Sequence, residues 1–176
     1  MGGWGIGMER MERVNRILSD GEYQAFLQEN GRREQDRLFC RHDLEHMLDV
    51  ARLTYILLLE AGQLAQACPG AGRELAYAAG LLHDIGRWRQ YDGHGDHAAD
   101  GARLAGPILE RAGFSPQEAA VIRRAIGEHR SADAGSSCLG AALARADDLS
   151  RPCFRCRARE HCYKAARMET AAGLMR

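Results

Sequence analysis

The stretch AAGLLHDIGR (residues 78–87) places an imidazole and a carboxylate, His83 and Asp84, directly after a small apolar run. An apolar run of this kind packs in a protein interior. Burial of an ionisable side chain there is costly unless the group is paired or coordinates a metal ion. The stretch therefore predicts a buried helix that leads into a metal site, and it favours hydrolytic chemistry.

The length and composition predict one domain with one core. The chain has 176 residues, of which 45% are hydrophobic and only 6% aromatic. Alanine and leucine dominate the apolar set, which favours helix. Lys+Arg and Asp+Glu both number 24, so the formal net charge is zero. This balance argues against a broad nucleic-acid footprint or an acidic-lipid surface.

Apolar residues recur at helical spacing, and no useful length alternates with period two. We expect an all-α, single-domain bundle of about six or seven helices around a metal site. Residues 1–20 would form an N-terminal leader and first helix, 21–150 the metal-binding helical domain, and 151–176 a Cys-containing tail packed on it. The expected helices cover residues 8–18, 22–30, 43–67, 73–85, 97–112, 116–129, 139–149 and 163–175, with a loop at 88–95.

The start of the chain does not have the pattern of a secretory signal. Residues 1–7 lack a basic region followed by a long apolar stretch. The longest apolar run, near residues 55–59, is too short to span a bilayer. We therefore expect a cytoplasmic protein with no membrane partner. Its six cysteines would then be reduced thiols or metal ligands.

Histidine and aspartate residues recur near the ends of the expected helices. His42 and His46 lie four residues apart and share a helical face. Imidazole with carboxylate oxygen suits Fe, Mn, Co or Zn better than Mg or Ca. A carboxylate can bridge two ions, and a two-metal site activates a water molecule and binds a phosphoryl group. The remaining candidates are His83, Asp84, His97, His129, Asp147 and Asp148.

This order of residues resembles the HD-domain superfamily of metal-dependent phosphohydrolases, over roughly residues 42–147. The matching segments are HMLDVAR (46–52), LHDIG (82–86), HAADGA (97–102), AIGEH (125–129) and ADDL (146–149). The two extra histidines, His97 and His129, are similar to those of the subgroup that holds two metals. That subgroup includes cyclic-dinucleotide phosphodiesterases and hydrolases of dinucleoside polyphosphates. The resemblance implies one metal ion on His46, His83, Asp84 and Asp147, and a second on Asp84, His97 and His129.

Two further residues are candidates for catalysis beside Asp84. His42 would serve as an outer-shell donor or a substrate contact, or it is simply a polar residue before a helix. Arg87 follows His83 by one helical turn, so its guanidinium could bind phosphate oxygens bidentately. The alternative for Arg87 is a surface position.

Other polar residues near these motifs have structural interpretations. Glu34 and Arg37 could form an ion pair ahead of the site. Asp148 is expected on the opposite helix face from Asp147, outside the ligand set.

The C-terminal tail carries a cysteine cluster. Cys153 and Cys156 form a C-x-x-C pair, and Cys162 follows six residues later. Cys40 would be a fourth ligand, with His161 as the alternative. Thiolate sites of this kind select zinc or an iron–sulfur cluster. Packed reduced cysteines or a redox switch are the other interpretations.

The resemblance implies a phosphomonoester or phosphodiester hydrolase that uses a metal-activated water. The expected substrate is a nucleotide or another small phosphorylated molecule, and nucleic acid is not expected. A di-iron oxygenase of the same fold and a non-catalytic nucleotide sensor remain as alternatives. The sequence also leaves a homodimer open.

Overall fold

The computed structural model describes residues 10–68, 72–130 and 135–174, and in these ranges it contains helices and no β-strand. The expectation of an all-α bundle is thus confirmed. Two short helices are α4 (Leu64–Ala67) and α6 (Arg87–Tyr91). The seven described helices of eight or more residues are α1 (Glu12–Ser19), α2 (Gly21–Arg33), α3 (Leu44–Glu60), α5 (Gly72–Leu82), α7 (His97–Ala112), α8 (Pro116–Glu128) and α9 (Cys138–Leu149).

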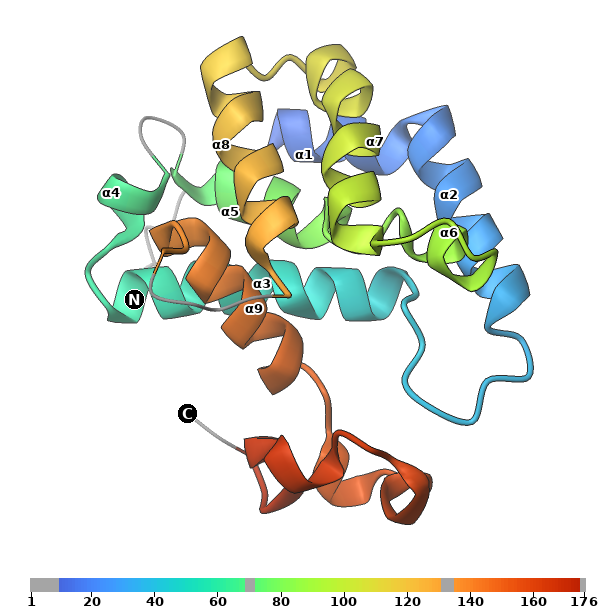
Figure 1. The fold of residues 1–176 in the computed structure, drawn as a ribbon. Helices are drawn as coiled ribbons and strands as arrows, with labels where there is room; N and C mark the ends of the chain where they lie inside the picture. The colour runs from blue at the N-terminus through green and yellow to red at the C-terminus, as the bar shows by residue number, and fades with distance from the viewer. Residues whose placement is uncertain (1–9, 69–71, 131–134, 175–176) are drawn as a thin grey trace, which may run out of the picture.

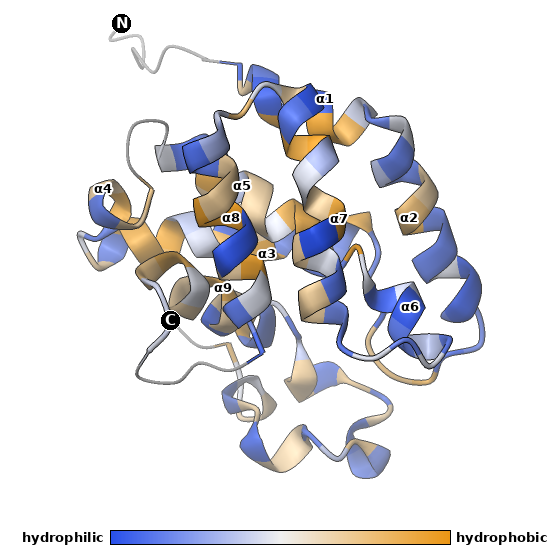
Figure 2. Cartoon of the chain, turned by 45° about the horizontal axis from the view of Figure 1, so that its top comes forward, coloured by the Kyte–Doolittle hydropathy of each residue, from blue (hydrophilic) through white to orange (hydrophobic). Residues whose placement is uncertain are grey.

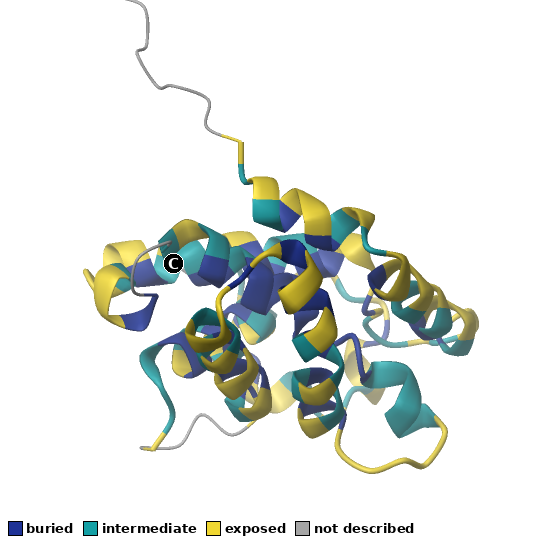
Figure 3. Cartoon of the chain, turned by 90° about the horizontal axis from the view of Figure 1, so that it is seen from above, coloured by how far each residue is buried: buried dark blue, intermediate teal, exposed yellow. Residues whose placement is uncertain are grey.

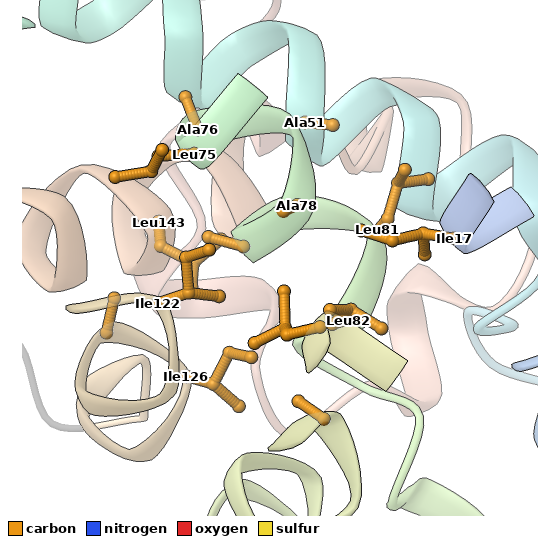
Figure 4. Close-up of a cluster of buried hydrophobic side chains, with 14 of the residues drawn as sticks. Ile17, Ala51, Leu75, Ala76, Ala78, Leu81, Leu82, Ile122, Ile126 and Leu143 are labelled. Atoms are coloured by element: carbon orange, nitrogen blue, oxygen red, sulfur yellow. The ribbon is translucent and has the colours of Figure 1, made fainter. Parts of the chain in front are cut away.

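Helix α5 forms the centre of the bundle. Seven of its eleven residues are buried, and it contacts α1, α3, α7, α8 and α9. Leu75 and Leu82 of α5 belong to the same buried cluster as Ile122 and Ile126 of α8 (Figure 4). Helix α3 passes below α5 and α8 in Figure 1. The apolar residues of the helices are turned toward this centre (Figure 2), and buried residues gather there when the bundle is seen from above (Figure 3).

A glycine allows α3 and α5 to approach closely. A Cβ atom added at Gly80 would lie 2.3 Å from the Cα atom of Ala51. No side chain fits at such a distance, so the contact needs glycine on α5 and a small residue on α3. The close approach brings His46 of α3 next to the end of α5.

Side-chain caps fix where the site-bearing helices begin. Asp43 accepts the backbone N–H of His46 at 3.0 Å, which places His46 in the first turn of α3. Asp96 caps α7, so that His97 is its first residue. Ser115 and Glu118 form a reciprocal capping box at the start of α8, as the Ser-Pro pair predicts. The first two caps place His46 and His97 in the first turns of their helices.

Several helix boundaries differ from those expected. The helix expected at 43–67 is interrupted between α3 and α4, because Gly62 adopts a left-handed φ of 65°. The helix expected at 73–85 ends at Leu82, so His83 and Asp84 lie in the turn that follows. The expected loop at 88–95 contains most of α6. Helix α1 begins at Glu12, and residues 8–9 of its expected range lie outside the described residues.

The tail departs most from expectation. Its described part forms four 3-10 turns: η1 (Cys153–Arg155), η2 (Arg159–His161), η3 (Ala165–Arg167) and η4 (Glu169–Ala171). The helix expected at 163–175 is absent over residues 163–174. That stretch buries only Met168 and Thr170, so it lacks the apolar face that stabilises a longer helix. In the described ranges, no helix has the length and apolar character needed to cross a membrane.

Candidate metal centre

The structure brings the predicted ligand residues together in two groups. The ligand atoms of His46, His83, Asp84 and Asp147 lie within 4.8 Å of one another. Asp84, His97 and His129 form a second such group. These are the same two groups that the resemblance implies, and they share Asp84. The residues come from α3, the turn after α5, α7, the end of α8 and α9.

Asp84 lies at the centre, with one oxygen directed to each group. Its Oδ1 atom is 3.1 Å from Nε2 of His97 and 3.7 Å from Nε2 of His129. Its Oδ2 atom is 3.3 Å from Nε2 of His83. A carboxylate in this position can bridge two cations.

The other carboxylate completes the first group. Oδ1 of Asp147 is 3.3 Å from Nε2 of His46 and 3.9 Å from Nε2 of His83. Asp147 therefore faces the side of His83 that also faces Asp84. The first group offers two imidazole nitrogens and two carboxylate oxygens.

Backbone carbonyls orient two of the histidine rings. Nδ1 of His83 lies 2.7 Å from the Gly80 carbonyl oxygen, and Nδ1 of His129 lies 2.6 Å from that of Ile126. A carbonyl oxygen only accepts hydrogen bonds, so each Nδ1 donates its hydrogen. Each Nε2 then presents a lone pair toward Asp84, which is the tautomer that a metal ligand needs.

The site contains buried polar atoms that no described protein group satisfies. Nε2 of His83 and Oδ1 of Asp84 are buried and have no hydrogen-bond partner in the described structure. A buried unsatisfied polar atom costs about 1–3 kcal/mol. The short contacts around Asp84 therefore lack hydrogen-bonding geometry, although the atoms are close. A divalent cation between these donors would satisfy them, so the residues fit the metal.

The electrostatic environment gives the two carboxylates and His46 the protonation states of metal ligands. Burial alone would raise the pKa of Asp84, but His83 and His42 outweigh it and hold the pKa well below its usual value. The pKa of Asp147 is likewise lowered, against burial, by His46 and Arg151. Burial lowers the pKa of His46 to about 4. At neutral pH the carboxylates are therefore ionised and His46 is neutral.

Two arginines lie beside the ligand atoms. Nη1 of Arg87 is 3.1 Å from Nε2 of His97, and Arg87 lines the cavity rather than the open surface. Nη2 of Arg151 is 2.7 Å from Nε2 of His46 and 3.2 Å from Oδ1 of Asp147. The positive charge of the two guanidinium groups offsets the negative charge of the carboxylates. It also suits the binding of phosphate oxygens.

His42 is held by an acidic partner. Its backbone N–H donates to Oε2 of Glu34 at 2.7 Å, and its Nδ1 contacts Oε1 of the same carboxylate. The Tyr91 hydroxyl also donates to Glu34, at 2.5 Å. Nε2 of His42 lies 3.6 Å from Oδ2 of Asp84. His42 is therefore buried at the edge of the first group, outside both ligand sets.

One structural interpretation was wrong. Glu34 does not pair with Arg37, because its carboxylate is taken by His42 and Tyr91, while Arg37 donates to the Cys40 carbonyl at 2.9 Å. Asp148 lies outside both ligand groups, as expected, although it lines the same cavity as Asp147.

Sequence reasoning missed several residues of the site. Glu34 reaches His42, and Tyr91 reaches Glu34 from a separate segment, but no local pattern marks these contacts. Asn30 of α2 donates to the Asp84 carbonyl at 3.0 Å and accepts the Trp88 N–H at 2.8 Å, again without a sequence signal. Arg151 could have been found, because it follows Asp147 by four residues.

The second ligand group and the two carboxylates of the first, Asp84 and Asp147, line one cavity of about 740 Å³. His83 is fully buried behind them, and His46 lines a neighbouring cavity. The walls of the first cavity are basic around the carboxylates, and part of them comes from the C-terminal tail. The basic lining residues are Arg87, Arg130, Arg145, Arg151, Lys164 and Arg167.

The four predicted cysteines lie around two adjoining cavities. Cys40, Cys153 and Cys156 line one of about 550 Å³, and Cys40, Cys153 and Cys162 line another of about 60 Å³. In the described chain, only the two His/Asp groups bring three or more ligand atoms within 4.8 Å. The four cysteines therefore line neighbouring cavities, but no three of their sulfurs lie within 4.8 Å of one another in the described structure. The cysteine site stays a prediction. His161 is exposed and lines neither cavity.

Comparisons with known proteins agree with this geometry. The HD domain family matches residues 43–152. An uncharacterized protein of Clostridium beijerinckii is 36% identical over 152 residues, which cover 86% of this chain and 92% of that protein. Ribonuclease Y of Enterococcus faecalis is 30% identical over 82% of this chain, and that of Campylobacter jejuni subsp. doylei 34% over 64%.

The chain spans only 27% and 19% of these two ribonucleases. No solved structure matches the chain significantly. The family match covers more than half of the chain and includes every residue of both ligand groups. His42, which belongs to neither group, lies one residue before the matched range. The chain therefore belongs to the HD domain family, part of the superfamily of metal-dependent phosphohydrolases.

Proposed function

We propose that this protein is a metal-dependent phosphohydrolase that cleaves a phosphoester bond in a nucleotide or a similar small phosphorylated molecule. The observation that carries the proposal is the position of Asp84, whose two oxygens face two separate ligand groups at the base of a basic cavity. A bridging carboxylate with four imidazoles and a second carboxylate is a donor set for two transition-metal ions.

Residues around these ligands would have separate roles in phosphate binding and proton transfer. Divalent ions held there would lower the pKa of a water molecule and supply positive charge to the phosphoryl group. Arg87 and Arg151 would bind phosphoryl oxygens and stabilise the charge that develops on them. His42 would hold or transfer a proton at Nε2, because Glu34 fixes its ring from the Nδ1 side.

The shape and charge of the cavity support a small anionic substrate. Its volume of about 740 Å³ lies within the range of sites for small molecules. Arg130 and Arg145 are paired with Asp96 and Glu169. The other two distal cations, Lys164 and Arg167, make no ion pair with a described residue. They are available for a second phosphate or another anionic group of the substrate.

A second candidate is the hydrolysis of RNA phosphodiester bonds. It is favoured by the two relatives named Ribonuclease Y and by the basic walls of the cavity. The zero net charge disfavours a long nucleic-acid footprint, so this activity would be confined to chain ends or short oligonucleotides.

The proposal can be tested with a panel of nucleotides, other phosphoesters and short oligoribonucleotides. Metal-free protein would be supplied with Mn, Co, Fe, Zn or Mg in turn, and phosphate or nucleotide release measured. We expect turnover with a transition metal, and loss of both metal and turnover in His83→Ala and Asp84→Ala. His94→Ala is the matched control, because His94 is exposed and lies outside the cavity.

Three results would contradict the proposal. If Asp84→Ala hydrolyses the substrate at the parent rate, the site is wrongly assigned. Oxygen consumption by the iron-loaded protein, without phosphoester turnover, would instead favour the oxygenase. Tight nucleotide binding with no turnover under any metal would favour the sensor.

A further inference from the structure

The described part of the tail, residues 151–174, has little apolar burial of its own. Only Ala158, Met168 and Thr170 are buried in it, and its regular structure is limited to 3-10 turns of three residues each. In Figure 1 this segment lies below α9, apart from the helical bundle. Segments with so little buried area usually need a metal ion or a covalent cross-link to keep one conformation.

Two regions distant in sequence bring cysteines to the tail. Cys40 lies in the loop before α3, and it lines both cysteine-lined cavities together with Cys153. Cys156 lines the larger cavity and Cys162 the smaller one. Burial raises the pKa of the Cys40 thiol, and the charge of Arg151 opposes this effect. All four are free thiols of intermediate exposure.

The backbone already holds the cysteine-bearing segments near one another. The Cys156 N–H donates to the Cys153 carbonyl at 3.2 Å, which closes the C-x-x-C turn. The Arg151 guanidinium donates to the Arg41 carbonyl at 2.8 Å and so joins the start of the tail to the loop that carries Cys40.

We propose that Cys40, Cys153, Cys156 and Cys162 bind one zinc ion that fixes the tail to the helical bundle. Four thiolates at about 2.3 Å from the metal form the closed tetrahedron typical of structural zinc. Thiolate ligands select zinc over the harder ions that a carboxylate-rich site accepts. This site shares no residue with the two His/Asp groups. Zinc would displace the thiol protons and draw the sulfurs together.

The zinc site has a consequence for the basic cavity. Tyr163 and Lys164 directly follow Cys162 in the sequence, and both line the basic cavity that Asp84 and Asp147 also line. Zinc at the four cysteines would therefore fix this wall of the cavity. The consequence rests on the proposed function, but the zinc assignment does not.

The test uses the full chain in the Asp84→Ala background, in which metal at the His/Asp groups is weakened. Zinc per chain is measured by elemental analysis, and Co²⁺ is used as a probe because thiolate ligands give it an intense charge-transfer absorption in the near ultraviolet. We expect one zinc ion per chain and this absorption. Cys153→Ser/Cys156→Ser should lose both. Cys138→Ser is the control, because Cys138 begins α9 and lines none of the three cavities described.

Two further measurements keep the test decisive if the double variant folds poorly. Cys162→His should retain zinc, because histidine replaces cysteine in tetrahedral zinc sites. Chelation of the unaltered chain should release zinc together with a rise in thiol reactivity and in cleavage of the tail by trypsin. Zinc and Co²⁺ spectra unchanged by Cys153→Ser/Cys156→Ser would overturn the proposal. So would iron with acid-labile sulfide at these cysteines, which would identify a cluster instead.

Discussion

At the residue scale, the two sides of Asp84 have different neighbours. Its Oδ1 faces His97 and His129, whereas its Oδ2 faces His83 and His42. His42 is therefore the one histidine in contact with Asp84 that belongs to neither ligand group. Its Nδ1 is occupied by Glu34, and its Nε2 is turned to the cavity. This arrangement suits proton transfer rather than metal binding.

Substitution of His42 should therefore separate catalysis from metal binding. We expect His42→Gln to retain its metal content and to lower kcat by about 100-fold, the usual contribution of a general acid or base. His46→Gln should instead lose metal from the first group. Elemental analysis and initial rates on the same preparations distinguish the two. Loss of metal in His42→Gln would make His42 a ligand and contradict the assignment.

Glu34 should act through His42. In Glu34→Gln the amide keeps the size of the side chain but removes the charge that holds the His42 ring. We expect a smaller fall in kcat than for His42→Gln, and little further loss when the two changes are combined. Additive losses would show that Glu34 has a separate role.

The metal-free protein should lose stability on acidification because of His46. Its pKa is lowered to about 4 by burial, from about 6.5 in the unfolded chain. The contribution of neutral His46 is therefore complete above pH 6.5 and is lost as the pH falls toward 4. The loss should reach about 3 kcal/mol at most.

Denaturant unfolding of the metal-free protein between pH 7 and 4 measures this effect. His83 acts in the opposite direction, because its pKa is raised by Asp84 and Asp147 against the effect of burial. The informative quantity is therefore the difference between the parent chain and His46→Gln, whose pH slope should be shallower. Equal slopes would show that His46 is not buried in the neutral form.

At the element scale, the distance between α3 and α5 sets the geometry of the first ligand group. His46 belongs to α3, whereas His83 and Asp84 follow α5. These helices approach closely because Gly80 packs on the backbone of Ala51. A larger residue at position 80 would separate the helices and, with them, the ligands.

Two alanine substitutions test this packing. Gly80→Ala should destabilise the fold by about 1–3 kcal/mol through overpacking and weaken metal binding. Gly127→Ala is the matched control, because Gly127 is also helical but an added Cβ there meets nothing within 4 Å. It should stabilise the protein by up to about 1 kcal/mol. Denaturant unfolding gives both values, and a neutral Gly80→Ala would mean that the helices can move apart freely.

The helix boundaries show how much of the fold can be predicted from the sequence. Helices α7, α8 and α9 follow from apolar spacing and from the Ser115 cap. The end of α5 at Leu82 does not, because Ile85 is also apolar and continues the pattern beyond the true boundary. The ligand set followed from the resemblance, whereas spacing alone could only suggest that the helix ends converge.

The residues that support the site through long-range hydrogen bonds could not be predicted from local sequence patterns. Asn30 ties α2 to the Asp84 turn through two hydrogen bonds that span more than 50 residues. Glu34 reaches His42 through the loop before α3. Such contacts depend on how the helices pack, and periodicity within one segment carries no information about them.

At the scale of the whole molecule, a zero net charge hides an uneven distribution. Cations gather around the cavity, where the carboxylates Asp84 and Asp147 would be neutralised by metal ions. The loaded cavity would then attract anions although the chain as a whole is neutral. Two of these cations, Lys164 and Arg167, come from the tail, and neither makes an ion pair with a described residue.

The tail cations should therefore bind substrate rather than take part in the reaction. We expect Lys164→Ala/Arg167→Ala to raise KM for a nucleotide substrate about 10-fold, equivalent to about 1.4 kcal/mol, with kcat little changed. The dependence of KM on ionic strength should become shallower, because fewer charges contribute to attraction. Arg32→Ala/Arg103→Ala removes the same charge from exposed sites outside the cavity and should change neither quantity. If kcat falls while KM is unchanged, these residues act on the transition state, and the wall formed by the tail belongs to the catalytic machinery itself.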